Sequence, residues 1–120
     1  MRDPHLSAAV AAVHREPARA WTVAKLAVLV GMSRTAFATR FALLLGESPM
    51  RYLARFRMTR AIELLRDSRL SLSTIAERVG YASDVAFHKA FKRHVGVGPG
   101  AFRRTASAQS KRIRADVGSA

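Results

Sequence analysis

Apolar residues recur at intervals of three and four along most of the chain, which is the period of an amphipathic helix. No stretch shows the strict alternation expected of a half-buried strand. Leu6, Val10 and Val13 predict a first short helix, which ends before Pro17 because proline cannot continue a helix. The pattern therefore predicts an all-α fold.

Capping residues divide the rest of the pattern into six further helices. Ser and Thr are favoured before the first helical residue, and Gly after the last one. The predicted helices run from Val23 to Val30, from Ser33 to about Leu45, from Pro49 to about Arg66, from Ser71 or Ser73 to before Gly80, from Ser83 to before Gly96, and from Pro99 around Phe102. From Thr105 onward the periodicity disappears, which predicts a disordered tail.

The chain repeats itself internally. Leu26-Ala27 and Val30-Gly31 reappear 49 positions later, as Ile75-Ala76 and Val79-Gly80. After this glycine the offset becomes 50, and the matched residues are Ser33 and Ser83, Phe37 and Phe87, Phe41 and Phe91, Gly46 and Gly96, Pro49 and Pro99, and Tyr52 and Phe102. The added residue falls in the turn after the glycine, where insertions are tolerated.

Each copy combines a short helix, a glycine turn and a longer helix. In the first copy Ala27 lets the two helices cross closely, Gly31 allows the tight turn, and Phe37 anchors the second helix to the first. This packing is typical of a helix-turn-helix. A helical repeat that binds protein is the alternative. We predict a first helix-turn-helix subdomain at residues 1–48, a linker helix at 49–67, a second subdomain at 68–105 and a disordered basic tail at 106–120.

Charge narrows the choice of partner. The chain has 21 Lys and Arg against eight Asp and Glu, a formal net charge of +13. Such a basic domain attracts polyanions, of which nucleic acid is the commonest, although an Arg-rich composition alone could produce the same excess. Cysteine is absent, which excludes disulfides and thiol chemistry. With no signal peptide and no long apolar run, we expect a cytoplasmic protein.

Several motifs resemble those of the AraC/XylS-type regulators. The longest is the run Gly80-Tyr81-x-Ser83-x3-Phe87-x3-Phe91-Lys92-x3-Gly96-x2-Pro99-x2-Phe102-Arg103. Further motifs upstream are similar to the rest of that family's DNA-binding domain: Trp21-Thr22-Val23, Gly31-Met32-Ser33-Arg34 and Met58-x2-Ala61-x2-Leu64-Leu65. The resemblance covers about residues 5 to 105.

The resemblance implies seven helices in two subdomains, binding to promoter DNA, and RNA polymerase as a further partner. Family members usually carry a separate effector or dimerisation domain, which this sequence does not contain. We therefore expect either a C-terminal domain separated from its partner domain or a stand-alone member, and a monomer.

The second helix of a helix-turn-helix enters the major groove, so its DNA face lies opposite its core face. We expect the core face of this helix to carry Phe37, Phe41 and Leu44 in the first unit, and Phe87, Phe91 and His94 in the second. The opposite face of each helix is then the candidate DNA face. The family's base-reading positions then carry over to Thr35, Ala38, Thr39, Asp84, Val85, His88 and Lys89. Asp84 has an alternative role in stabilising a helix N-terminus, and His88 an alternative contact with a phosphate.

Basic residues around these faces are candidates for phosphate contacts, although solvated surfaces also carry many arginines. The predicted contacts are Arg34, Arg40, Arg51, Arg55, Lys92, Arg93 and Arg103. A linker helix of about 18 residues spans roughly 27 Å, which would suit two reading helices about one DNA turn apart.

Three other classes of function compete with this one. A cationic module for membranes or protein partners would leave apolar stripes without a core role, and a nucleoid-type protein would bind DNA without sequence preference. An enzyme is not expected, because the Ser, His and acidic residues form no catalytic or metal-binding arrangement. No cofactor and no metal are expected.

Overall fold

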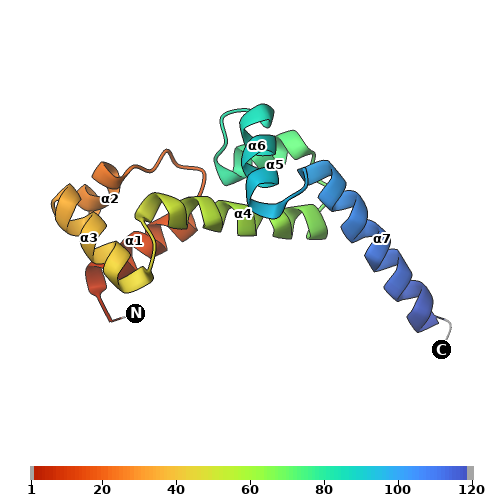
Figure 1. The fold of residues 1–120 in the computed structure, drawn as a ribbon, viewed down its shortest axis with the longest axis horizontal. Helices are drawn as coiled ribbons and strands as arrows, with labels where there is room; N and C mark the ends of the chain where they lie inside the picture. Colours follow the sequence, from red (N-terminus) through yellow and green to blue (C-terminus); the bar gives the residue numbers. More distant parts are fainter. Residues whose placement is uncertain (1, 119–120) are drawn as a thin grey trace. The chain divides into compact units, whose positions relative to one another are not determined.

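The computed structural model describes the backbone of residues 2–118 and the side chains of residues 2–112. This part of the chain contains seven α-helices and no strand, as the sequence predicts (Figure 1). The helices are α1 (Pro4–Arg15), α2 (Val23–Val30), α3 (Arg34–Leu45), α4 (Pro49–Asp67), α5 (Leu72–Val79), α6 (Asp84–Val95) and α7 (Pro99–Gly118). They form two compact units, Met1–Arg57 (unit 1) and Met58–Ala120 (unit 2).

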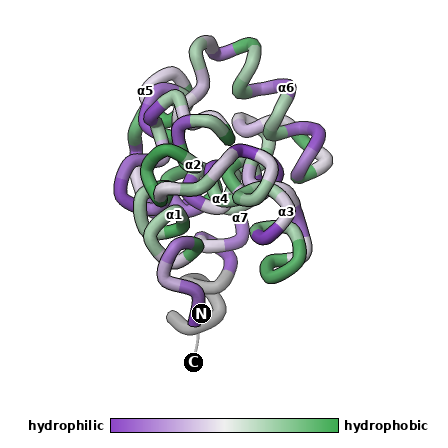
Figure 2. Tube along the Cα trace, turned by 90° about the vertical axis from the view of Figure 1, so that its left-hand side faces the viewer, coloured by the Kyte–Doolittle hydropathy of each residue, from purple (hydrophilic) through white to green (hydrophobic). Residues whose placement is uncertain are grey.

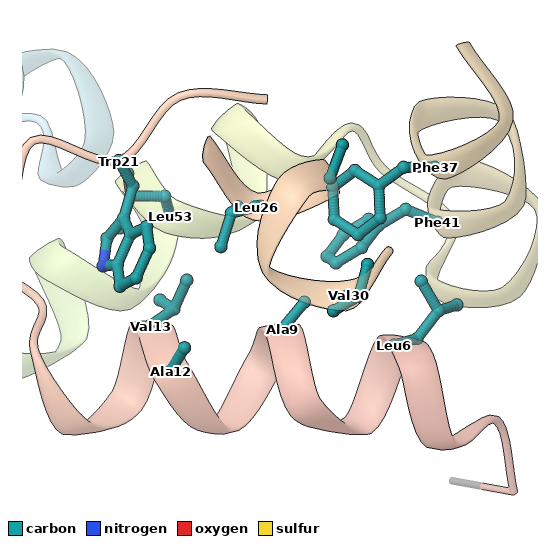
Figure 3. Close-up of a cluster of buried hydrophobic side chains, with 11 residues drawn as sticks. Leu6, Ala9, Ala12, Val13, Trp21, Leu26, Val30, Phe37, Phe41 and Leu53 are labelled. Carbon is teal, nitrogen blue, oxygen red and sulfur yellow. The ribbon is translucent and has the colours of Figure 1, made fainter. Parts of the chain in front are cut away.

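The core of unit 1 is built on one face of α1. Leu6, Ala9, Ala12 and Val13 point from this helix toward α2, α3, the first half of α4 and the indole of Trp21 (Figure 3). Asp3 starts the helix, because its carboxylate accepts hydrogen bonds from the backbone N–H groups of His5 and Leu6. The indole Nε1–H of Trp21 donates to the carbonyl of Glu16 at 2.9 Å, which satisfies its polar atom inside an apolar cluster.

Unit 2 builds the same core from a different stretch of chain. Met58, Ala61 and Leu65, on the second half of α4, have the same spacing as Leu6, Ala9 and Val13 on α1. The second half of α4 thus serves unit 2 as α1 serves unit 1. The internal repeat is therefore one helix longer than the sequence comparison indicates, and α4 is a core element of both units as well as a linker.

A chain of three aromatic rings runs through each core. In unit 1 the centroids of Phe37 and Phe41 lie 5.7 Å apart, and Phe41 meets Tyr52 edge-on at 5.7 Å. In unit 2 the corresponding Phe87, Phe91 and Phe102 are spaced by 5.8 and 5.6 Å. These separations are typical of favourable tilted aromatic pairs. The rings attach the second helix of each helix-turn-helix to the helix that follows it.

The two glycine turns have matching geometry. Gly31 (φ 72°) and Gly80 (φ 105°) end α2 and α5 in the left-handed region, where a side chain would be strained. The following residues, Met32 and Tyr81, donate their N–H groups to Ala27 and Ala76, each at 2.9 Å. The next helix starts at a serine in both units. The hydroxyl of Ser33 accepts a hydrogen bond from the backbone N–H of Ala36, and the hydroxyl of Ser83 accepts one from Ala86, each at 3.1 Å.

The structure corrects three details of the sequence analysis. Leu44 and His94, predicted to face inward, are exposed, because α3 and α6 turn their neighbours Leu45 and Val95 toward the core instead. The helix after Pro99 continues to Gly118, so the tail predicted as disordered is helical over residues 106–118. The loss of apolar periodicity indicates that this segment has no face packed against a core, not that it cannot be helical. Residues 101–117 contain no Gly or Pro that would end the helix.

No single helix in the part of the chain that the structure describes is long and apolar enough to cross a membrane. Among these residues α2 and α3 are long and apolar enough only when taken together, and the chain bends by 93° between them. Figure 2 shows the hydrophobic stretches of α2 and of the end of α3.

Prediction for the core of unit 1. Phe37→Ala removes a fully buried ring and should lower the free energy of unfolding by about 3–5 kcal/mol, because the neighbours cannot close the cavity. Urea unfolding followed by the fluorescence of Trp21, the single tryptophan, reports on this unit. Leu43→Ala on the same helix is the control: its side chain is 79% exposed, and a change below about 0.5 kcal/mol is expected. Equal losses would contradict the core assignment.

Candidate nucleic-acid interface

The second helix of each helix-turn-helix, α3 in unit 1 and α6 in unit 2, presents one face to its core and the other to solvent. We call these two the reading helices. Phe37 and Phe41 bury one face of α3, and Phe87 and Phe91 bury one face of α6. The structure leaves most of the predicted base-reading residues exposed: Thr35, Thr39, Asp84, Val85, His88 and Lys89. Ala38 is half-buried at the edge of the face.

The two reading faces differ in chemistry. Thr35, Ala38 and Thr39 offer α3 only methyl groups and short hydroxyls. His88 and Lys89 give α6 longer nitrogen donors, and Asp84 and Val85 precede them where α3 has Arg34 and Thr35. Donors of that length can reach the N7 and O6 atoms of guanine, while threonine and alanine methyls suit the thymine methyl group.

An ion pair positions the reading helix of unit 1. The guanidinium of Arg40 on α3 pairs with the nearly buried carboxylate of Asp3, the residue that starts α1. The matching residue of α6 is Ala90, which is buried in the apolar core of unit 2. Unit 1 therefore uses an ion pair where unit 2 uses packing, and Arg40, predicted to contact a phosphate, is already paired with an acid.

The pKa of Asp3 lies below its ordinary value. Burial of the carboxylate opposes ionisation, but hydrogen bonds from the Leu6 and His5 N–H groups, together with the charge of Arg40, outweigh that effect. The fold therefore favours the charged form of this carboxylate.

Asp84 also has an intramolecular partner. The hydroxyl of Ser73 on α5 donates to its Oδ1 at 3.0 Å, and Asp84 occupies the first turn of α6. A carboxylate at this position stabilises the helix N-terminus. The contact joins the two helices of the helix-turn-helix, and it gives Asp84 a structural role in addition to its predicted contact with a base.

Most of the predicted phosphate contacts are exposed, but Arg55 is also paired with an acid. Arg34, Arg51, Lys92 and Arg93 are exposed. Arg55 hydrogen-bonds to Glu47 at 2.5 and 2.9 Å, and its guanidinium lies 5.3 Å from the ring centroid of Tyr52. The hydrogen bond with Glu47 raises the pKa of Arg55, and the positive charge of this guanidinium is already paired with a carboxylate.

Arg103 is a structural residue. Its half-buried guanidinium donates to the backbone carbonyls of Leu64, Leu65, Ser68 and Leu70, at 2.6 to 3.4 Å. It therefore attaches α7 to the end of α4 and to the turn between α4 and α5. This structural role stands beside the phosphate contact, which stays a prediction. Arg57, which the sequence analysis did not single out, does similar work in unit 1 by donating to the carbonyls of Pro17 and Arg19.

Two glycine-turned helix pairs, each with an exposed outer face on its second helix, in a chain of charge +13, define a DNA-binding protein of the helix-turn-helix class. Comparison with known proteins agrees. The sequence matches the helix-turn-helix domain family over residues 26–105.

Named relatives identify the family more closely. An AraC-like transcription regulator of Streptomyces lividans is 42% identical over 104 residues, and the regulator AlkR of Acinetobacter baylyi is 44% identical over the same length. Each match covers 87% of this chain and 34% of the relative, so the chain spans about a third of these proteins. The crystal structure of the DNA-binding domain of AdpA in complex with a target DNA is similar, with a TM-score of 0.84 and 34% identity, over 89% of this chain and 96% of that one.

The chain belongs to the AraC-like transcription regulators, and it corresponds to their DNA-binding domain. The resemblance seen in the sequence is thus confirmed, as is the fold of seven helices in two helix-turn-helix units.

Prediction for the Asp3–Arg40 pair. Because the pKa of Asp3 is lower in the folded than in the unfolded chain, its charge stabilises the fold above about pH 4, and this contribution is lost as the pH falls through the folded-state pKa. Asp3→Asn keeps an oxygen that can start α1 and removes only the charge. The variant should unfold more easily than the parent at pH 6, with the difference shrinking toward pH 3. Urea unfolding followed by Trp21 fluorescence measures the difference in the free energy of unfolding between the variant and the parent. A difference that does not change with pH would contradict the ion pair.

Proposed function

We propose that the chain binds one asymmetric double-stranded DNA site, with α3 and α6 each inserted into the major groove. The observation that carries the proposal is that the same scaffold exposes the outer face of its second helix twice in one chain. A dimeric helix-turn-helix protein reads a palindrome with two copies of one surface. Here the two surfaces differ, so a single monomer would read two different half-sites in a fixed order.

The two half-sites would be read unequally. His88 and Lys89 support direct hydrogen bonding to base edges by α6, with Lys89 suited to guanine. The methyl groups and hydroxyls of Thr35, Ala38 and Thr39 support contact with thymine methyls and reading of DNA shape by α3. Val85, 63% exposed on α6, adds an apolar contact to the second half-site.

Exposed cations around the reading helices would hold the DNA backbone. Arg34 begins α3, Arg51 lies in the first turn of α4, and Lys92 and Arg93 lie in the last turn of α6. Such contacts supply affinity and fix the register of the protein on the duplex without reading sequence. Arg40 and Arg55 would contribute less, because each is paired with an acid.

The biological role we propose is regulation of transcription in the bacterial cytoplasm, with RNA polymerase as a further partner. The related AdpA domain was crystallised with a target DNA, which supports DNA as the partner of this chain. A monomer is sufficient for the proposed function because both reading helices lie in one chain.

Prediction for base reading. Lys89→Ala should weaken binding to the preferred site by about 1–3 kcal/mol and leave binding to random duplex DNA nearly unchanged, because a base contact is lost and no phosphate contact. Fluorescence anisotropy with both duplexes measures the two affinities. Lys111→Ala on the exposed part of α7 is the matched control for loss of one positive charge. An equal loss on both duplexes would make Lys89 a phosphate contact.

Prediction for the backbone contacts. If the chain neutralises six or more phosphates, the logarithm of the binding constant should fall with the logarithm of salt concentration with a slope of about −5 or steeper. Arg51→Ala should make this slope shallower by about 1. A slope near zero for the parent chain would contradict DNA binding through this surface.

A further inference from the structure

A hollow of about 330 Å³ opens beside the reading face of unit 2. Leu72 at the start of α5, Val85 and Phe87 in the first turn of α6, and Pro99 at the start of α7 form its apolar walls. His88, Lys89 and Asp84 supply the polar part of the lining. Its volume lies at the lower end of the range of about 300–1,000 Å³ for small-molecule sites, which commonly combine apolar walls with a few polar groups.

The imidazole of His88 packs against Gly98 in the loop between α6 and α7. A Cβ atom built on Gly98 would lie 2.6 Å from Cε1 of the imidazole, so the ring rests where the glycine leaves room for it. The one acid in the lining, Asp84, already accepts a hydrogen bond from Ser73. The polar side of the hollow therefore combines a histidine, a lysine and an acid with its own partner.

The equivalent positions of unit 1 lack this chemistry. Through the repeat offsets of 49 and 50, Leu72, Val85, His88 and Lys89 correspond to Val23, Thr35, Ala38 and Thr39. The helix-turn-helix scaffold, which both units share, thus does not require a bulky apolar wall with a lysine and a histidine beside it.

We infer that this hollow binds a small aromatic carboxylate, with the ring between Leu72, Val85 and Pro99 and the carboxylate against Lys89. Apolar walls on three helices fit a flat hydrocarbon ring, and a lysine in a chain of charge +13 favours a negative over a neutral or positive ligand.

A ligand in the hollow would exclude DNA. Val85, His88 and Lys89 line the hollow and also form the reading face proposed for α6, so both partners cannot occupy them together. The chain would then release DNA in response to an aromatic acid bound at the reading helix itself. This consequence rests on the proposed DNA binding, whereas occupation of the hollow does not.

The test titrates benzoate into the ¹⁵N-labelled chain without DNA, with neutral benzamide as the matched probe. Benzoate should shift the amide signals of Leu72, Val85 and Lys89, with a Kd on the order of 1 mM for so small a ligand. Benzamide and the variant Lys89→Ala should each weaken binding by about fivefold, as expected when one partly exposed ion pair is lost.

Two further variants separate the hollow from general charge effects. Leu72→Trp fills the hollow from α5 without changing charge and should abolish the benzoate shifts, while Arg78→Ala, exposed on α5 and outside the lining, should leave them unchanged. The inference is overturned if benzoate shifts no signal around the hollow, if benzamide binds equally well, or if Leu72→Trp, shown to be folded by its amide spectrum, still binds.

A second measurement distinguishes this inference from the proposed function. The parent chain is tested for binding to its preferred duplex with and without benzoate at ten times its Kd. Loss of binding in benzoate, but not in benzamide, supports the inference. DNA binding that persists while benzoate fills the hollow overturns the competition, and failure to bind DNA even without benzoate overturns the proposed function alone.

Discussion

The rest of the structure depends on one interaction, the packing of two phenylalanines of each reading helix into the core of its unit. Phe37 and Phe41, and likewise Phe87 and Phe91, turn one face of their helix inward and so determine which residues face solvent. The small Ala27 and Ala76 and the glycine turns allow the first helix to cross close to these rings. Every candidate contact with DNA follows from this orientation, because a helix rotated by a third of a turn would present different side chains.

The shared helix α4 shows how one scaffold is used twice. Its first half carries Leu53 into the core of unit 1, and its second half carries Met58, Ala61 and Leu65 into the core of unit 2. Neither core is complete without its part of this helix. The surfaces of the two units have diverged: the exposed Val28, Leu29, Leu43 and Leu44 of unit 1 correspond to Glu77, Arg78, Arg93 and His94 of unit 2. A common core therefore supports two chemically different exteriors.

Helix positions could be predicted from the chain because their signals are local: a serine cap, a glycine stop and an apolar period act within a few residues. The outward position of Lys89 followed from the same periodicity. The role of Arg103 could not be predicted, since an arginine that binds four carbonyls 33 to 39 residues away is identical in sequence to one that binds a phosphate. The partner of Arg40 and the hollow beside Val85 likewise depend on residues brought together only by the fold.

The central claim is that two unequal reading helices recognise one asymmetric DNA site. Selection of bound sequences from a random duplex pool tests it most directly. The account predicts enrichment of one oriented site with two different short boxes about ten base pairs apart, the spacing of successive major-groove segments. The box read by α6 should be the more restricted, and guanine should occur opposite Lys89. A pool that shows no enrichment, as expected of a protein that binds DNA without sequence preference, or a palindrome of identical boxes would contradict the account.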